Sequence, residues 1–266
     1  MTQYNRRAQI FLLAVALAPW PIPVFAQALE RLSDKDVKAL IDQVDEGRDK
    51  FEGNLDGAFK GSTLRGPTGE AKVSAVLQDY QDNTQKLKDR FTADYSASAE
   101  VATVLKQSTA INTFMSGSPS AMKGRSEWDG QASNLKRLAD SYGTSFPYTE
   151  GAAVRRMNDK ETAGFAASIA AAAEGLKNSV GKAKTLTKPD QEAAKKDLEL
   201  LTKQANAAKS RISEGKPATG EVRQLVEQVA KLQTFVDAHE VSGAATGWQS
   251  VQTSLSKLQQ AFGLIK

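Results

Sequence analysis

Apolar side chains recur every three or four residues through most of the chain, the spacing that places them on one face of an α-helix. The pattern predicts four helices over about 33–60, 70–91, 98–115 and 120–142, joined by turn-rich loops such as 61–69. Four more are predicted over about 158–184, 188–213, 220–238 and 245–262. Apolar alternation with a period of two is absent, so no sheet is expected. The sequence therefore predicts an all-α fold.

Helix-capping residues stand near the predicted boundaries. Ser33, Ser98 and Thr187 are suited to N-caps, since a side-chain oxygen there accepts a hydrogen bond from a free backbone N–H. Thr219 is also a start signal, and Gly143 suits a left-handed C-cap.

The two sets of helices match each other in order, which predicts an internal duplication. Apolar residues of the third helix recur 121 residues later in the seventh, and Trp128 recurs at Trp248, 120 residues later. Near the start the offset is 125, where Asp34-Lys35 matches Asp159-Lys160. The offsets change only inside predicted loops.

Short loops between successive helices favour antiparallel neighbours, so each copy is expected to form an up-and-down four-helix bundle. The predicted divisions are a signal peptide over 1–26, a first helical repeat over 27–143, a linker over 144–155 and a second repeat over 156–266. A single continuous eight-helix assembly is the alternative. Copy two is richer in alanine, which predicts closer helix packing there.

The first 26 residues have the features of a cleaved signal peptide. Arg6 and Arg7 precede an apolar run over 10–18 that is too short to span a bilayer, and three prolines follow it. Small or branched residues at 24 and 26 predict cleavage after Ala26. A retained anchor is the alternative, and the Arg pair fits the twin-arginine route poorly. The expected location is periplasmic or secreted.

Composition excludes several classes of function. The chain has no cysteine, which rules out disulfides, thiol catalysis and lipid attachment to cysteine. Its 35 basic and 31 acidic side chains are interleaved rather than gathered on one stripe, so nucleic acid is not an expected partner. No segment of the mature chain is long and apolar enough to suggest a transmembrane helix.

The single histidine argues against a metal centre or a Ser–His nucleophile system. His239 stands where a helix is predicted to end, and a cation there is stabilised by the helix dipole. A lone haem or metal ligand is the alternative, but pairing with Met115, Met122 or Met157 has no support from the sequence. No cofactor and no catalytic residue is predicted.

Two further features are candidate sites. Six acidic residues between positions 42 and 56 (Asp42, Asp45, Glu46, Asp49, Glu52 and Asp56) could present paired carboxylates to a cation such as calcium, although a solvated helix face explains them better. Trp128 and Trp248 suit core positions, and the functional alternative is that each indole closes a groove for a ligand or partner.

The first copy resembles the uncharacterised secreted helical proteins of environmental bacteria. The resemblance is carried by segments 32–37 and 47–51, by 101–114, and by the series Trp128, Leu135, Leu138 and Tyr142. It implies no activity.

The leading hypothesis is therefore an exported, non-catalytic helical-bundle protein that binds an unknown protein or an envelope component. The alternative is a periplasmic carrier of a small ligand or cation. A hydrolase ranks third, because no nucleophile motif such as G-x-S-x-G is present.

Overall fold

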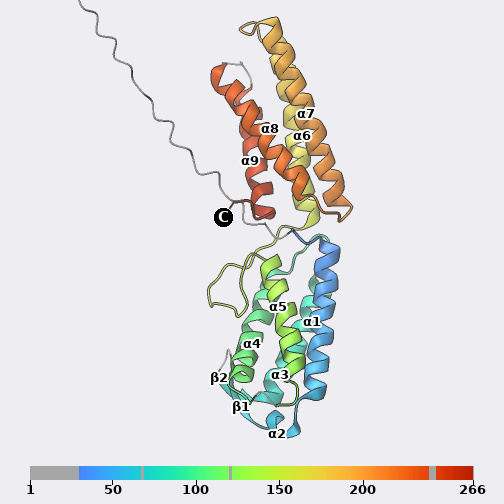
Figure 1. The fold of residues 1–266 in the computed structure, drawn as a ribbon, viewed down its shortest axis with the longest axis vertical. Helices are drawn as coiled ribbons and strands as arrows, with labels where there is room; N and C mark the ends of the chain where they lie inside the picture. The colour runs from blue at the N-terminus through green and yellow to red at the C-terminus, as the bar shows by residue number, and fades with distance from the viewer. Residues whose placement is uncertain (1–29, 67–68, 120–121, 240–243, 266) are drawn as a thin grey trace, which may run out of the picture.

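The computed structural model describes residues 30–66, 69–119, 122–239 and 244–265, so the predicted cleavage site after Ala26 lies outside it. The described chain is mostly helical, as predicted, and it forms two helical halves stacked end to end (Figure 1). The N-terminal half contains α1 (Asp34–Asn54), α2 (Gly57–Lys60), β1 (Thr63–Gly66), β2 (Gly69–Lys72), α3 (Val73–Arg90), α4 (Ser98–Ser116) and α5 (Arg125–Ser141). The C-terminal half contains α6 (Asp159–Lys182), α7 (Lys188–Ser213), α8 (Thr219–Ala238) and α9 (Ala245–Ala261).

Each half surrounds its own hydrophobic core. In the N-terminal half α1 packs against α3 and α5, and α4 packs against the same two helices. In the C-terminal half α6 packs against α7 and α9, and α8 against the same two. The largest buried side chains of the first core include Phe51, Tyr80, Trp128 and Tyr142. The helical period of the apolar residues thus brings four long helices around one core in each half.

The second core contains many small side chains. Seven buried alanines face one another across the long helices α6 and α7: Ala163, Ala166, Ala170, Ala173, Ala194, Ala205 and Ala208. Alanine costs no side-chain conformational entropy in a helix and leaves room for a neighbouring backbone.

Most predicted caps are present. Ser33 and Asn158 each accept a hydrogen bond from the third helical residue, whose own side chain returns one to the cap backbone. Thr187 caps α7, and Gly143 has the predicted left-handed conformation with φ of 66°. Ser98 and Thr219 are instead the first residues of α4 and α8.

The prediction of no sheet was wrong, because β1 and β2 form a two-stranded antiparallel hairpin in the segment expected to be a loop. Each strand has four residues, and only Leu64 is buried, so no period-two pattern was visible in the sequence. Helix α1 ends at Asn54 rather than near Lys60, because Asp56 caps the separate short helix α2.

Two other predicted boundaries change. Helix α3 begins at Val73, after the hairpin, and α5 begins at Arg125 rather than near position 120. Gly124, with φ of 85°, precedes α5 in a conformation that an L side chain rarely adopts.

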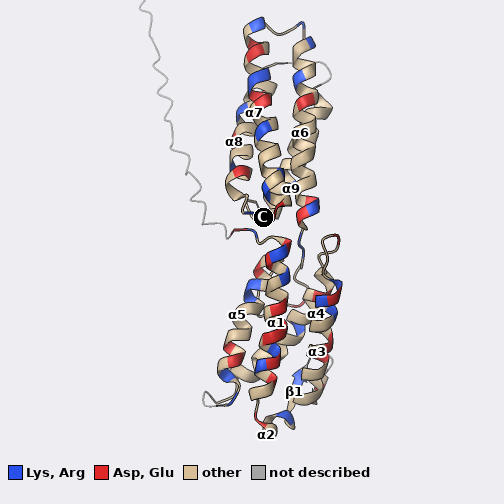
Figure 2. Ribbon diagram, turned by 90° about the vertical axis from the view of Figure 1, so that its right-hand side faces the viewer, with Lys and Arg blue, Asp and Glu red and all other residues tan. Residues whose placement is uncertain are grey.

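Basic and acidic residues are interspersed along the helices of both halves (Figure 2). Among the described residues, no helix combines the length and apolar character that crossing a membrane requires.

Candidate functional site

The N-termini of α1 and α6 meet where the two halves join (Figure 1). Each helix is preceded by an arginine, an apolar residue and a capping residue: Arg31-Leu32-Ser33 before Asp34, and Arg156-Met157-Asn158 before Asp159. The two segments are 125 positions apart.

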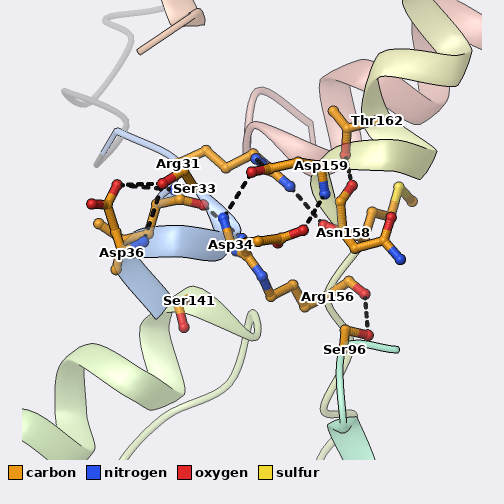
Figure 3. Close-up of polar contacts among 12 residues, drawn as sticks. Arg31, Ser33, Asp34, Asp36, Ser96, Ser141, Arg156, Asn158, Asp159 and Thr162 are labelled. Carbon is orange, nitrogen blue, oxygen red and sulfur yellow. Dashed lines mark hydrogen bonds and ion pairs between the residues drawn. The ribbon is translucent and has the colours of Figure 1, made fainter. Parts of the chain in front are cut away.

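The two segments bind each other reciprocally (Figure 3). The backbone N–H of Asp34 donates to Asp159 Oδ2 at 2.8 Å, and the N–H of Asp159 donates to Asp34 Oδ2 at 2.7 Å. Each carboxylate thus meets a free N–H at the other helix's N-terminus, where negative charge is stabilised.

The arginines complete the same pattern. Arg31 donates to Asp159 Oδ1 at 2.5 Å and to the carbonyl of Met157 at 2.7 Å. Arg156 donates to Asp34 Oδ1 at 2.8 Å and to the carbonyl of Leu32 at 2.7 Å. We call Arg31, Asp34, Arg156 and Asp159 the Arg–Asp clamp. Its contacts are self-complementary, as in a two-fold symmetric interface.

The clamp is shielded from solvent. The side chains of Arg31 and Arg156 are 7% and 3% exposed, and those of Asp159 and Asp34 are 17% and 13% exposed. Burial lowers the pKa of Arg31 and the charge of Arg156 lowers it further, whereas Asp159 and Asp34 oppose the change. Within the described part of the chain, Nε of Arg156 has no hydrogen-bond partner. Paired carboxylates make burial of the two like-charged guanidinium groups tolerable.

A cavity of about 590 Å³ lies beside the clamp. All its lining residues except Phe262 form pairs, 125 positions apart near α1 and α6 and 120 positions apart near α5 and α9. The pairs are Glu30 with Arg155, Arg31 with Arg156, Leu32 with Met157, Arg137 with Lys257, Asp140 with Gln260, Ser141 with Ala261, and Gly143 with Gly263. The cavity therefore lies between equivalent surfaces of the two halves.

The wall combines positive charge with apolar surface. Five lining side chains are cationic and two, Glu30 and Asp140, are acidic. Leu32, Met157 and Phe262 supply the larger apolar groups. This volume and mixed lining are typical of sites that enclose small molecules.

Two aromatic residues, Tyr142 and Phe262, lie at the C-terminal ends of α5 and α9, beside the junction. The guanidinium carbon of Arg31 lies 5.8 Å from the centre of the Phe262 ring. Tyr142, the counterpart of Phe262, is buried, and its hydroxyl donates to the carbonyl of Ser96. Burial raises the pKa of Tyr142 above its usual value, so the hydroxyl keeps the proton of this bond even in alkaline solution. The Ser96 hydroxyl in turn donates to the carbonyl of Arg156 at 3.0 Å.

A second cavity of about 150 Å³ adjoins the first and shares Glu30, Arg31, Leu32 and Phe262 with it. Lys216 and Asp36 are among its lining residues.

The predicted candidate residues lie elsewhere. Trp128 and Trp248 are 1% and 5% exposed, near the starts of α5 and α9 and far from the junction (Figure 1). Their indole N–H groups donate to Asn112 Oδ1 at 3.1 Å and to Gln233 Oε1 at 2.8 Å. Both indoles are core residues with satisfied N–H groups. Neither indole lines the two cavities, and the alternative in which each indole closes a groove stays a prediction.

His239 is the C-cap residue of α8, as its position predicted. Its Nδ1 lies 3.0 Å from the carbonyl oxygen of Phe235, and its ring stacks on the Phe235 ring with centroids 4.5 Å apart.

Cationic side chains bind several of the clustered carboxylates on α1. Arg48, only 4% exposed, lies 3.0 Å from Asp45 and 2.8 Å from Asp49, and Lys88 bridges Asp42 and Asp45. Burial raises the pKa of Asp45, but hydrogen bonds from Arg48 and Lys88 outweigh this and leave it below its usual value. In the described ranges, no three His, Cys, Asp or Glu side chains are grouped as a metal site requires.

Sequence reasoning missed the Arg–Asp clamp, although one signal was present. The match of Asp34 with Asp159 extends back to Arg31 and Arg156, which keep the same offset of 125. Each of the two arginines precedes its helix cap at the same spacing, which indicates equivalent positions in the two halves. The spacing does not show that the two helix ends meet.

No family model matches the chain, and neither a curated protein nor a solved structure matches it.

Proposed function

We propose that this protein is an exported, non-catalytic binding protein that encloses a small ligand between two tandem up-and-down four-helix bundles. The bundles arose by internal duplication, and the ligand site is the cavity at their junction. The observation that carries the proposal is this cavity of about 590 Å³, whose wall combines cationic and apolar side chains from both halves.

Recurring element starts support the duplication. Helices α1 and α6 begin 125 residues apart, α4 and α8 begin 121 apart, and α5 and α9 begin 120 apart. These are the offsets at which the sequence repeats.

Specific polar contacts also recur at these offsets. Each indole N–H donates to a side-chain amide oxygen on the preceding helix. The acceptor is Asn112 in the N-terminal half and Gln233 in the C-terminal half. The ion pair between Arg90 and Glu100 recurs between Arg211 and Glu221. Two unrelated amphipathic halves would not need the same polar pairs at the same offsets. The matched pairs therefore support descent from one ancestral unit.

Export and the type of ligand complete the proposal. The basic start, short apolar run and cleavage signal at Ala26 support a periplasmic or secreted location. A cavity of about 590 Å³ suits a small ligand better than the protein partner that the sequence first suggested. The wall supplies groups that bind and orient a ligand, which favours binding over chemistry. The proposal includes no cofactor.

Native mass spectrometry of the mature protein, purified gently from its own host, tests the proposal. The expected spectrum contains a bound mass of small-molecule size. Ala261→Trp, which fills the cavity from the end of α9, should abolish that mass. Ala207→Trp, on the exposed face of α7, is the matched control and should retain it. Protein that carries no bound mass, or whose bound mass is unchanged in Ala261→Trp, would contradict the proposal.

A further inference from the structure

Three cations of the cavity wall lack an acidic partner. In the part of the chain that the structure describes, the side chains of Arg155 and Lys257 have no hydrogen bond or ion pair. Arg137 reaches only the amide oxygen of Gln43, at 3.4 Å. Arg31 and Arg156, by contrast, are held by the carboxylates of the clamp. The wall therefore carries positive charge that the protein itself does not neutralise.

The acidic side chains of the wall do not remove this excess. Asp140 binds Lys136, one turn earlier on α5, at 2.7 Å. Glu30 is the other acid of the wall, and its single charge cannot neutralise Arg137, Arg155 and Lys257 together. Like charges around a shared cavity repel one another, and an anion that enters relieves the repulsion.

The unpaired cations come from both halves. Arg137 and Lys257 are equivalent positions, each one turn before the end of its helix, α5 or α9, and Arg155 lies just before Arg156 in the connecting segment. An anionic group between the two halves could therefore accept hydrogen bonds from both of them.

The apolar part of the cavity wall suits a ligand that has an apolar portion. Leu32, Met157 and Phe262 line the same cavity, and a small inorganic anion would leave these groups in contact with water. We infer that the ligand is an organic anion, whose charged group lies among Arg137, Arg155 and Lys257 and whose apolar body lies against these three side chains. This inference rests on the proposed function and specifies the chemical class of its ligand.

Two fluorescent probes with the same ring system test the charge requirement directly. 8-Anilinonaphthalene-1-sulfonate carries a sulfonate, and N-phenyl-1-naphthylamine is its uncharged parent. Titration into the mature protein should show the sulfonate binding at least about tenfold more tightly, since charge-assisted hydrogen bonds add to shared apolar contact.

Variants then locate the charge that matters. The double variant Arg137→Gln, Lys257→Gln should weaken sulfonate binding about tenfold, because each exposed cation contributes roughly a threefold effect. It should leave binding of the uncharged probe unchanged. The matched control Arg65→Gln, Lys203→Gln removes two exposed cations that do not line the cavity and should change neither affinity. Ala261→Trp should remove binding of both probes.

The outcomes separate this inference from the proposed function. Equal affinity for the two probes, or no effect of the double variant on the sulfonate, would overturn the anionic class while leaving the cavity as a binding site. Loss of neither probe in Ala261→Trp would show that both bind elsewhere, and this inference would fail. The native spectrum described above tests the binding function independently, because it involves neither probe.

Discussion

Breaking one arm of the Arg–Asp clamp is expected to loosen the junction between the two halves. Arg156→Met removes the bond to Asp34 at 2.8 Å and the bond to the carbonyl of Leu32 at 2.7 Å, but keeps a long apolar side chain in place. It leaves the Asp34 carboxylate, only 13% exposed, without its cation.

The expected cost follows from this geometry. Removing one partner of a buried ion pair destabilises a protein by about 3–5 kcal/mol, because the other charge stays buried and unpaired. Asp34 still accepts the backbone N–H of Asp159 at 2.7 Å, so the lower value of about 3 kcal/mol applies. Asp34→Asn keeps an acceptor for that N–H, and its cost should be about 2 kcal/mol.

A double-mutant cycle isolates the clamp from the rest of the fold. Urea unfolding of the mature protein, followed by far-UV circular dichroism, gives the free energy of unfolding for each variant. The double variant Arg156→Met, Asp34→Asn should cost about 3 kcal/mol rather than the sum of the single effects, because neither change leaves an unpaired charge when both are made.

An exposed ion pair provides the matched control. Lys231 lies 2.7 Å from Asp197 within the C-terminal half, with side chains 63% and 24% exposed. Lys231→Met should therefore cost no more than about 1 kcal/mol. If Arg156→Met costs as little as this control, or if the single effects of the cycle add within about 0.5 kcal/mol, the clamp is not the energetic unit described here.

Three further results are expected. Burial raises the pKa of Tyr80 to about 12 against about 10 in an unfolded chain, so its contribution to stability is complete below pH 10 and lost towards pH 12. Urea unfolding should show wild type losing about 2 kcal/mol more than Tyr80→Phe between pH 10 and pH 12, and equal losses would refute the burial argument. Gly47→Ala should destabilise the protein by about 1–2 kcal/mol, since a Cβ atom would lie 2.2 Å from Oε1 of the buried Gln131. Gly164→Ala is the matched control in the same assay. It has open space around it and should stabilise the protein by about 0.5–1 kcal/mol. N-terminal sequencing of the exported protein should begin at Gln27, and a chain that retains the first 26 residues would contradict the predicted cleavage.

Local signals made the helices predictable. Apolar residues of α6 to α9 follow the helical period without interruption, and their predicted bounds agree with the structure within about two residues. The N-caps Ser33 and Thr187 and the left-handed Gly143 were predictable because a cap depends on groups within one turn of the chain. The short hairpin was not, since four-residue strands with one buried side chain carry too little pattern.

Buried polar residues show the limit of reasoning from pattern alone. Arg48 lies within the run of acidic residues for which a solvated face of α1 was predicted, yet its side chain is 4% exposed and binds the neighbouring carboxylates. In the folded half Tyr80 and Gln131 bond to each other at 2.6 Å, although 51 positions separate them. A polar residue is therefore not always exposed. It is buried where another helix covers it and provides a hydrogen-bond partner.

The sequence by itself determined the helical character of the chain, because helical period and caps depend on near neighbours. The matching order of the two halves and the export signal are predictions that also come from the sequence alone. Only the tertiary structure placed Arg31 opposite Asp159 and Arg156 opposite Asp34, and only it brought Arg137 and Lys257 to one cavity. These groups are more than 100 residues apart in the chain, and no local interaction specifies their contact. They meet because each half closes around its own core and because the N-termini of α1 and α6 bind each other's carboxylates.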